Sequence, residues 1–228
     1  MSATQWGDLT AQSPPFRAAG GARPGRRGSW WVAKRAFDVA FSLAALAFLA
    51  PLWALIAAAV RLGDSGPVFY RQERVGLGGR PFTLLKFRTM AVGADALVDG
   101  LIAERACAAV FFKVPGDQRV TRVGRVLRRW SLDETPQFWN VLRGEMSVVG
   151  PRPQVAREVA EYAPEHFKRL DVRPGITGLW QVSGRNSLTV AESLRLDLEY
   201  VCGFGPLADL RVLVRTVPAI ARSAAEDW

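Results

Sequence analysis

Residues 39–60 read VAFSLAALAFLAPLWALIAAAV, twenty-two positions without a charged side chain. At about 1.5 Å of rise per residue, a helix of this length would be about 33 Å long, enough to cross the hydrocarbon core of a bilayer. Basic side chains flank the run equally, with six before it and six in the thirty residues that follow. The positive-inside rule orients a crossing helix by an asymmetry of such charges, and this sequence has none.

Pro51 lies in the middle of this apolar run. Proline lacks an amide hydrogen and clashes with the preceding helical turn, so we expect a kink there. A bent apolar helix with two basic ends can enter and leave a membrane by the same face. We therefore predict that residues 34–61 form a re-entrant membrane helix, anchored around Pro51. A simple crossing helix and a buried core helix stay open, whereas a secretory signal would have an apolar core of only about 7–15 residues.

Composition limits the chain to one anchored domain. It has 228 residues and a net charge of +9, which suits an anionic membrane surface, a phosphate-bearing substrate or nucleic acid. Residues 1–33 are rich in Gly, Pro, Ala, Ser and Arg, and we predict a disordered basic tail there. Residues 62–224 are predicted to form one catalytic domain. The tandem Trp30-Trp31 is typical of a membrane-interface belt, or it forms a hydrophobic plug on the domain.

Several chemistries are excluded by residue type. His166 is the one histidine, and the two cysteines, Cys107 and Cys202, stand in no metal or redox spacing. A zinc site and a Ser-His-Asp or Cys-His nucleophile are therefore not expected, and a reduced cytosolic environment fits the chain.

The remaining pattern predicts an α+β class that is mainly helical, with a small β-hairpin region. Short strands are expected near 68–70 and 82–87, and helices over 93–113, 119–128, 132–143, 154–162, 189–200 and 206–224. The helix over 119–128 carries an arginine at every third position, either as a solvated stripe or as a surface for anionic groups. The helix over 206–224 interleaves apolar residues with arginines, which is typical of a helix in a membrane interface. Packing on a core produces the same periodicity.

Ser131-Leu132-Asp133-Glu134 matches a capping box, with Ser131 as the N-cap. This motif predicts a helix from Leu132 that ends at Gly144, and acids in its first turn have a purely structural explanation. Arginines nevertheless surround the two acids in the sequence: Arg125, Arg128, Arg129, Arg152, Arg173 and Arg185. Arginine can bind phosphate through two parallel hydrogen bonds. A carboxylate that faces a bound phosphoryl group and a divalent cation is a sound nucleophile for phosphoryl transfer.

Several blocks of the sequence, taken together, resemble the bacterial sugar transferases, which are monotopic polyprenyl-phosphate phosphoglycosyl transferases. The blocks are KRAFD at 34–38, the apolar run with its central proline, KFRTM at 86–90, SLDETPQ at 131–137, GEMSVVGPRP at 144–153 and RPGITG at 173–178. They occur in the family's order and span residues 33–222. The large multi-helix N-terminal domain of some members is not expected, so the chain resembles a minimal form. Ala50 stands where many relatives have a serine before the proline.

The resemblance implies a phosphotransferase that moves a sugar 1-phosphate from a UDP-sugar to undecaprenyl phosphate and releases UMP. The implied location is the cytoplasmic face of the bacterial inner membrane, with both ends of the anchor inside. The reaction would be the first membrane step of exopolysaccharide or glycoconjugate synthesis, with downstream glycosyltransferases as further partners. Gly178–Gln181 and the GRN segment at 184–186 resemble hexose-1-phosphate transferases and favour galactose or glucose.

The resemblance also implies roles for individual residues. Asp133 would attack the sugar-linked β-phosphate and form a covalent phosphosugar–aspartyl intermediate, and Glu134 would assist as a metal ligand or positioning base. Mg²⁺ would be held by Asp133 and Glu134 and would bridge the diphosphate. Phosphate or nucleotide binding is expected of Lys86, Arg88, Arg128, Arg152, Arg173, Gln181 and Arg185.

Two other functions are disfavoured by the residues themselves. A nucleic-acid-binding protein would need basic residues clustered with stacking aromatics, whereas here they interleave with apolar residues and turns. We therefore expect no nucleic-acid partner. A lipid-phosphate phosphatase typically needs histidines or a P-loop, and the sequence offers neither.

Overall fold

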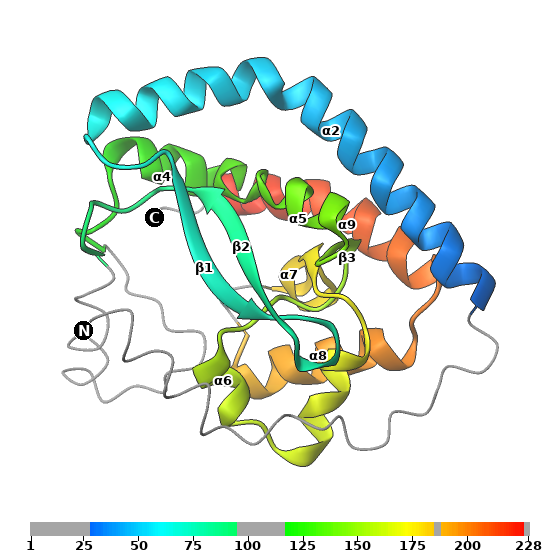
Figure 1. The fold of residues 1–228 in the computed structure, drawn as a ribbon. Helices are drawn as coiled ribbons and strands as arrows, with labels where there is room; N and C mark the ends of the chain where they lie inside the picture. The colour runs from blue at the N-terminus through cyan, green and yellow to red at the C-terminus, as the bar shows by residue number, and fades with distance from the viewer. Residues whose placement is uncertain (1–27, 95–116, 185–187, 226–228) are drawn as a thin grey trace.

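The computed structural model describes residues 28–94, 117–184 and 188–225 (Figure 1). Its elements are α2 (Gly28–Gly63), β1 (Phe69–Val75), η1 (Leu77–Gly79), β2 (Pro81–Phe87), α4 (Arg122–Arg129), η3 (Leu132–Glu134), α5 (Gln137–Arg143), β3 (Ser147–Val149), α6 (Ala156–Ala160), η4 (Pro164–Asp171), β4 (Gly175–Thr177), α7 (Leu179–Ser183), α8 (Val190–Cys202) and α9 (Pro206–Ala225). The mainly helical class with a small hairpin is confirmed. The helix predicted over 93–113 falls almost wholly outside the described residues.

The apolar run lies within α2, which continues through Pro51 and arches along one side of the domain (Figure 1). The helix begins at Gly28, six residues before the predicted start of the membrane segment at Lys34, and that membrane boundary stays a prediction. Among the described residues, α2 is the one helix that is long and apolar enough to cross a membrane. Only 11% of its most apolar window is buried, which argues against a core helix of a soluble protein.

The two tryptophans at the start of α2 face the domain. Trp30 and Trp31 pack against the main hydrophobic core, and the ring of Trp31 lies 4.7 Å from that of Phe204. The interpretation of the pair as a hydrophobic plug is therefore confirmed, and the interpretation as an interface belt stays a prediction. The sequence pattern could not distinguish the two, because both need an apolar ring at the end of an apolar helix.

Strands β1 and β2 form an antiparallel hairpin that pairs Phe69 with Phe87 and Val75 with Pro81. The turn between them, η1, uses Gly78 in the left-handed region (φ 65°), where glycine avoids the steric cost of a side chain. The hairpin is predicted correctly, but β1 extends five residues beyond Tyr70. Its second part is the polar segment 71–74, which carries no apolar alternation and is recognisable as a strand only through its pairing with β2.

The main core lies between β3, β4 and the C-terminal helices. β3 and β4 are parallel, with Ser147 opposite Gly175. They approach so closely that a Cβ atom on Gly175 would lie 2.0 Å from the backbone nitrogen of Gly150. The buried apolar residues of this core are Phe82, Leu84, Val141, Met146, Val148, Val149, Val172, Leu179, Val182, Tyr200, Val201, Phe204, Val212 and Ala219.

A second, smaller core links α2 to the hairpin and to α4. Its buried members are Ile56 and Val60 of α2, Phe87 of β2 and Leu127 of α4. Trp53, Phe69 and Leu132 pack against it as partly buried residues. This cluster, called the α2 cluster below, therefore joins the far half of the apolar helix to the three elements that carry Lys86, Arg128 and Asp133.

Helix α9 fits both interpretations of its periodicity. Val212 and Ala219 are buried in the main core, so one face packs on the domain. The opposite face leaves large apolar side chains exposed, namely Leu207, Leu210, Val214 and Val217.

Candidate active site

The two acids of the site lie on a short 3₁₀ turn, η3, and not at the start of an α-helix. Ser131 adopts the left-handed conformation (φ 55°) and makes no side-chain cap, so the predicted capping box is wrong. The α-helix begins only after Pro136, because proline has no amide hydrogen with which to continue the helical bonding. Gly144 ends α5 in the left-handed region (φ 80°), as predicted.

Ser131 is the one non-glycine residue with a positive φ in the described part of the chain. Such a conformation costs free energy and persists only when the surrounding structure imposes it. Ser131 stands two residues before Asp133, directly ahead of the 3₁₀ turn that carries both acids.

Asp133 is buried, with 8% of its surface exposed. Burial and the neighbouring Glu134 raise the pKa of its carboxyl group while Lys86 and Arg128 lower it, and the resulting pKa is about 6. The carboxylate is therefore ionised at neutral pH although it has lost much of its hydration. A poorly hydrated carboxylate beside cations has the properties required of a nucleophile toward an anionic phosphoryl group.

Lys86 projects from β2 toward Asp133, and its ammonium lies 5.0 Å from the centre of the Tyr70 ring. Burial and the surrounding arginines lower the pKa of Lys86 while Asp133 raises it, and the resulting pKa is about 8. A lysine in this state is cationic at neutral pH, and a bound anion would stabilise its charged form.

Arg128 reaches the site from α4, where its Nε donates to Thr89 Oγ1 at 2.9 Å. Burial lowers the pKa of this guanidinium and Asp133 raises it. Thr121 caps α4 by accepting from the Gly124 nitrogen, and the Thr121 backbone nitrogen donates to the Thr89 carbonyl oxygen at 3.0 Å, which holds α4 against the chain there. A Cβ atom on Gly124 would lie 2.0 Å from the Thr89 carbonyl oxygen, so only glycine permits this approach.

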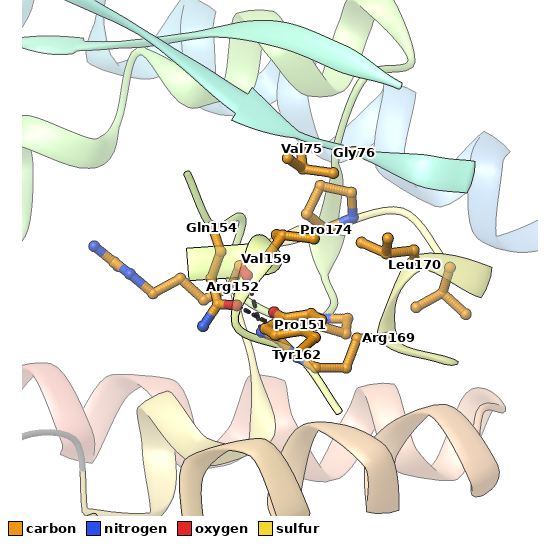
Figure 2. Close-up of a pocket in the computed structure, with 11 residues that line it drawn as sticks. Val75, Gly76, Pro151, Arg152, Gln154, Val159, Tyr162, Arg169, Leu170 and Pro174 are labelled. Atoms are coloured by element: carbon orange, nitrogen blue, oxygen red, sulfur yellow. Dashed lines mark hydrogen bonds between the residues drawn. The ribbon is translucent and has the colours of Figure 1, made fainter. Parts of the chain in front are cut away.

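Arg152 completes the far side of the site. Its Nη1 donates to Glu134 Oε1 at 3.2 Å. The loop that carries it is held by the buried Arg169, which donates to the Arg152 carbonyl oxygen (3.1 Å) and to Gln154 Oε1 (2.6 Å) and forms an ion pair with Asp197. Figure 2 shows Arg152, Gln154 and Arg169 around the pocket beneath the hairpin.

A further basic residue near the site, Arg74 of β1, was missed in the sequence. Its Nη1 donates to the Pro153 carbonyl oxygen at 3.0 Å, and its Nε and Nη2 donate to Gln72 Oε1. Burial and the nearby Arg152 lower its pKa to about 10. The available signal is strand alternation: Arg74 shares a face with Tyr70, whose cross-strand partner is Lys86.

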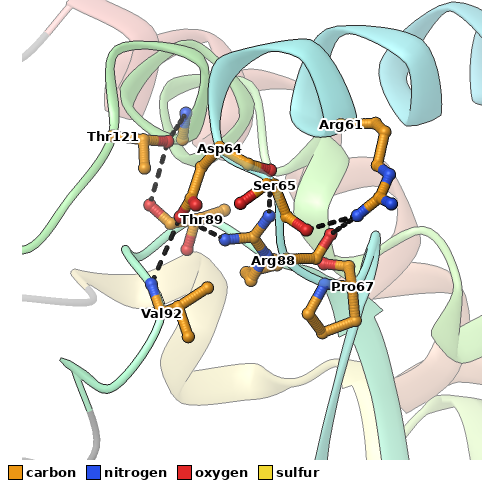
Figure 3. Close-up of polar contacts among 10 residues, drawn as sticks. Arg61, Asp64, Ser65, Pro67, Arg88, Thr89, Val92 and Thr121 are labelled. Carbon is orange, nitrogen blue, oxygen red and sulfur yellow. Dashed lines mark hydrogen bonds and ion pairs between the residues drawn. The ribbon is translucent and has the colours of Figure 1, made fainter.

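The structure does not bring the other predicted ligands to Asp133. Arg88 donates to Asp64 Oδ2 (2.5 Å) and to the Pro67 carbonyl oxygen (2.6 Å), and so holds the loop after α2 (Figure 3). Arg173 donates to the Gly144 carbonyl oxygen at 2.8 Å, and Gln181 donates to the Ile176 carbonyl oxygen at 3.0 Å. Arg185 lies outside the described residues.

The acids of the site can be compared with what a magnesium ion requires. In the described part of the chain no three His, Cys, Asp or Glu side chains gather as metal ligands. Mg²⁺ commonly takes only one or two carboxylates together with substrate phosphates and water. The adjacent carboxyl groups of Asp133 and Glu134 fit that donor set, and magnesium binding stays a prediction.

The structure thus places a buried carboxylate among basic residues, on a domain that carries a long, exposed apolar helix. Residues 29–223 match the family of bacterial sugar transferases, and the chain belongs to this family.

The relatives cover most of the chain. The exopolysaccharide production protein ExoY of Rhizobium meliloti (strain 1021) is 44% identical over 196 residues, which are 84% of this chain and 87% of ExoY. The UDP-glucose:undecaprenyl-phosphate glucose-1-phosphate transferase of Caulobacter vibrioides is 43% identical over 82% of this chain and 69% of its own length. The undecaprenyl-phosphate galactose phosphotransferase of Salmonella typhimurium is 38% identical over 83% of this chain, but only 40% of its own length is matched.

Proposed function

We propose that the protein transfers a hexose 1-phosphate from a UDP-sugar to undecaprenyl phosphate and releases UMP. The observation that carries this proposal is Asp133, a buried carboxylate with a pKa of about 6 that lies between the cations Lys86 and Arg128. The names of the Caulobacter and Salmonella relatives support the substrate classes, because both specify undecaprenyl phosphate.

In the first step a carboxylate oxygen of Asp133 attacks the β-phosphorus of the UDP-sugar. A new phosphorus–oxygen bond forms to the aspartate, and the bond between the β-phosphorus and the bridging oxygen breaks. UMP leaves with the electrons of that bond. Lys86, Arg128 and Arg152 are positioned to stabilise the negative charge that develops on the phosphate oxygens.

In the second step a phosphate oxygen of the lipid attacks the same phosphorus atom. The bond to Asp133 breaks, the carboxylate is regenerated, and a lipid diphosphate sugar is released. Mg²⁺ bound by Asp133 and Glu134 would supply charge neutralisation of the diphosphate. Arg152 orients Glu134 through their hydrogen bond.

The membrane arrangement proposed is a re-entrant α2 with both ends on the cytoplasmic side. Near its start, Lys34 forms a buried ion pair with Asp209 at 2.5 Å, and Arg35 donates to the carbonyl oxygens of Val141 and Leu142. Near its end, Ile56 and Val60 pack in the α2 cluster. A crossing helix would carry its ends to opposite faces of a hydrocarbon core about 30 Å thick, so one domain could not hold both.

Exposed side chains support the same arrangement. The middle of α2 leaves Phe48 84% exposed, and Leu43 and Leu55 are also exposed. On other helices the exposed apolar side chains are Trp130, Trp139, Leu207, Leu210, Val214 and Val217. Such side chains are stable in contact with lipid, and tryptophan favours the interfacial region.

The deciding experiment incubates purified protein with UDP-glucose or UDP-galactose, with no lipid acceptor, and measures the mass of the intact chain. We expect a gain of one hexose phosphate on Asp133, and no gain in Asp133→Asn. Addition of undecaprenyl phosphate should then restore the original mass, and excess chelator should suppress adduct formation. Normal turnover by Asp133→Asn would reject the nucleophile, and full activity in chelator would reject magnesium.

A further inference from the structure

The far half of α2 makes a hydrogen bond directly to the turn that carries the two acids. The indole Nε1 of Trp53 donates to Thr135 Oγ1 at 3.0 Å. Trp53 lies two positions after Pro51 in the exposed apolar helix, and Thr135 lies two positions after Asp133. This bond therefore joins the proposed membrane segment to the turn that carries the proposed nucleophile.

The hydroxyl group of Thr135 also closes that turn. Its Oγ1 donates to the Leu132 carbonyl oxygen at 2.8 Å, and the Thr135 backbone nitrogen donates to the same oxygen at 3.2 Å. The hydroxyl hydrogen is used in the bond to the Leu132 carbonyl oxygen. The hydroxyl oxygen can therefore accept the indole hydrogen of Trp53. The Thr135 side chain thus bonds both to Trp53 of α2 and to Leu132, the residue that precedes Asp133.

The ring of Trp53 is itself held by two phenylalanines of the hairpin. Its centre lies 5.5 Å from Phe87 and 6.4 Å from Phe69, in edge-to-face contacts, and the two phenylalanine rings stack at 5.3 Å. Aromatic pairs of this kind restrict orientation as well as burying area. The direction of the indole N–H is therefore set by β1 and β2.

The same cluster lies under three of the site residues. Phe87 is adjacent in sequence to Lys86, Leu127 to Arg128, and Leu132 to Asp133, and all three of these apolar residues belong to or pack against the α2 cluster. Loss of contact with α2 would disturb the nucleophile and two of its cations together. The strained conformation of Ser131 makes the turn that carries Asp133 the part most dependent on external restraint.

Given the function proposed above, we infer that Trp53 is a positioning residue for the catalytic turn: through Thr135 it couples the seating of α2 on the domain to the geometry of Asp133 and Glu134. The chemical step, and not the affinity for the sugar donor, is the quantity that depends on this bond.

The test uses the full chain, purified in detergent without the lipid acceptor, and five variants, one of them a control. Trp53→Phe keeps an aromatic ring and removes the N–H, Thr135→Val removes the hydroxyl, and the double variant removes both. Thr135→Ser retains the hydroxyl. Trp139→Phe is the matched control, because Trp139 is a half-exposed tryptophan on α5.

The measurement is the single-turnover rate of covalent adduct formation with UDP-glucose and with UDP-galactose, together with the donor concentration at half-maximal rate. We expect Trp53→Phe and Thr135→Val each to slow adduct formation by about 3- to 10-fold, the effect of one ordinary hydrogen bond. The half-saturating donor concentration should change by less than about 2-fold. The double variant should be no slower than Thr135→Val, while Thr135→Ser and Trp139→Phe should match the wild type.

Hydrogen exchange of the peptide that contains residues 131–136 supplies a readout without substrate. We expect faster exchange of the Glu134 and Thr135 amides in Trp53→Phe and Thr135→Val, and wild-type exchange in Thr135→Ser. Wild-type adduct rates in Trp53→Phe, or rate losses that multiply in the double variant, would overturn the positioning role. So would unchanged exchange in Trp53→Phe. Absence of any adduct in the wild type with altered exchange in Trp53→Phe would reject the proposed function and leave the coupling intact.

Discussion

Replacement of Asp133 by asparagine is expected to abolish transfer and at the same time to stabilise the fold. Burial raises the pKa of Asp133 from 3.8 to about 6. The folded protein therefore binds this proton more tightly than the unfolded chain does. Ionisation of Asp133 in the folded state costs free energy that the unfolded chain does not spend.

The magnitude follows from the pKa difference. Two pKa units correspond to about 3 kcal/mol at pH values above both pKa values. Asparagine keeps the size of the side chain, but its amide must still lose hydration, so about 1–2 kcal/mol should remain. For a chain of this size that gain would raise the melting temperature by about 3–6 °C.

The sign sets the pH window. Below pH 3.8 the carboxyl group is protonated in both states, and the Asp133 side chain carries no ionisation cost. Between pH 3.8 and about 6 the unfolded chain ionises Asp133 more readily than the folded protein, so the free energy of unfolding falls as the pH rises. Above about pH 6 the carboxyl group is ionised in both states, and the loss of stability is complete. The advantage of asparagine should therefore grow between pH 4 and pH 6.5 and then stay constant.

The assay is thermal unfolding of wild type and Asp133→Asn in detergent with EDTA, at pH 4.5 and pH 7.5, with adduct mass measured in parallel. EDTA is needed because a metal ion on Asp133 would stabilise the wild type alone. Asp171→Asn, at an exposed aspartate, is the control and should leave the melting temperature unchanged. A less stable Asp133→Asn at pH 7.5, or an equal gain at both pH values, would refute the reasoning.

The rate of adduct formation at low donor concentration should fall below pH 6 as Asp133 gains a proton and above pH 8 as Lys86 loses one, and Lys86→Met should remove the alkaline limb from the pH–rate profile. Arg169→Met should lower the free energy of unfolding by about 3–5 kcal/mol in thermal melts, because it leaves a buried carboxylate unpaired. In Gly124→Ala the activation free energy of adduct formation should rise by at least as much as the free energy of unfolding falls, because the new methyl group pushes α4, and with it Arg128, away from the site. Wild-type adduct rates in this variant would contradict that account.

The parts of the fold that could be predicted from the sequence depend on local patterns. The apolar run became most of α2, the glycine turn at 76–79 joined two strands, and Gly144 ended α5 with a positive φ. In each case neighbouring residues alone supply the cause, either apolar periodicity or a backbone conformation that glycine adopts without strain.

The capping box failed for a physical reason that short motifs do not contain. The motif at Ser131 is compatible with a helix start, but Pro136 prevents the helix from forming until five residues later. Thr135 instead satisfies the Leu132 carbonyl oxygen, and the acids lie on a 3₁₀ turn. The structural explanation for acids in a first helical turn disappears with the helix, which leaves the burial of Asp133 to be explained by function.

The arginines show the limit of reasoning from neighbouring prolines. Arg152 and Arg173 both precede or follow proline, yet only Arg152 contacts an acid of the site, and Arg173 instead donates to the carbonyl oxygen of Gly144. Whether a basic side chain faces the site depends on tertiary packing, which local sequence does not record. Arg74, in a polar strand without a motif, was missed for the same reason.

The basic side chains that surround Asp133 and Glu134 repel one another, and many of the contacts described above hold them in place. Four basic side chains, Arg74, Lys86, Arg128 and Arg152, act electrostatically on the two acids, so bases outnumber acids in this set. The pKa values of Arg74 and Lys86 are lowered because burial and mutual repulsion are only partly offset by those acids. A bound anion such as a diphosphate would offset the repulsion among these bases. The repulsion among these buried bases is unfavourable, and this favours an anionic nucleotide sugar over a neutral sugar before any contact with the hexose is made.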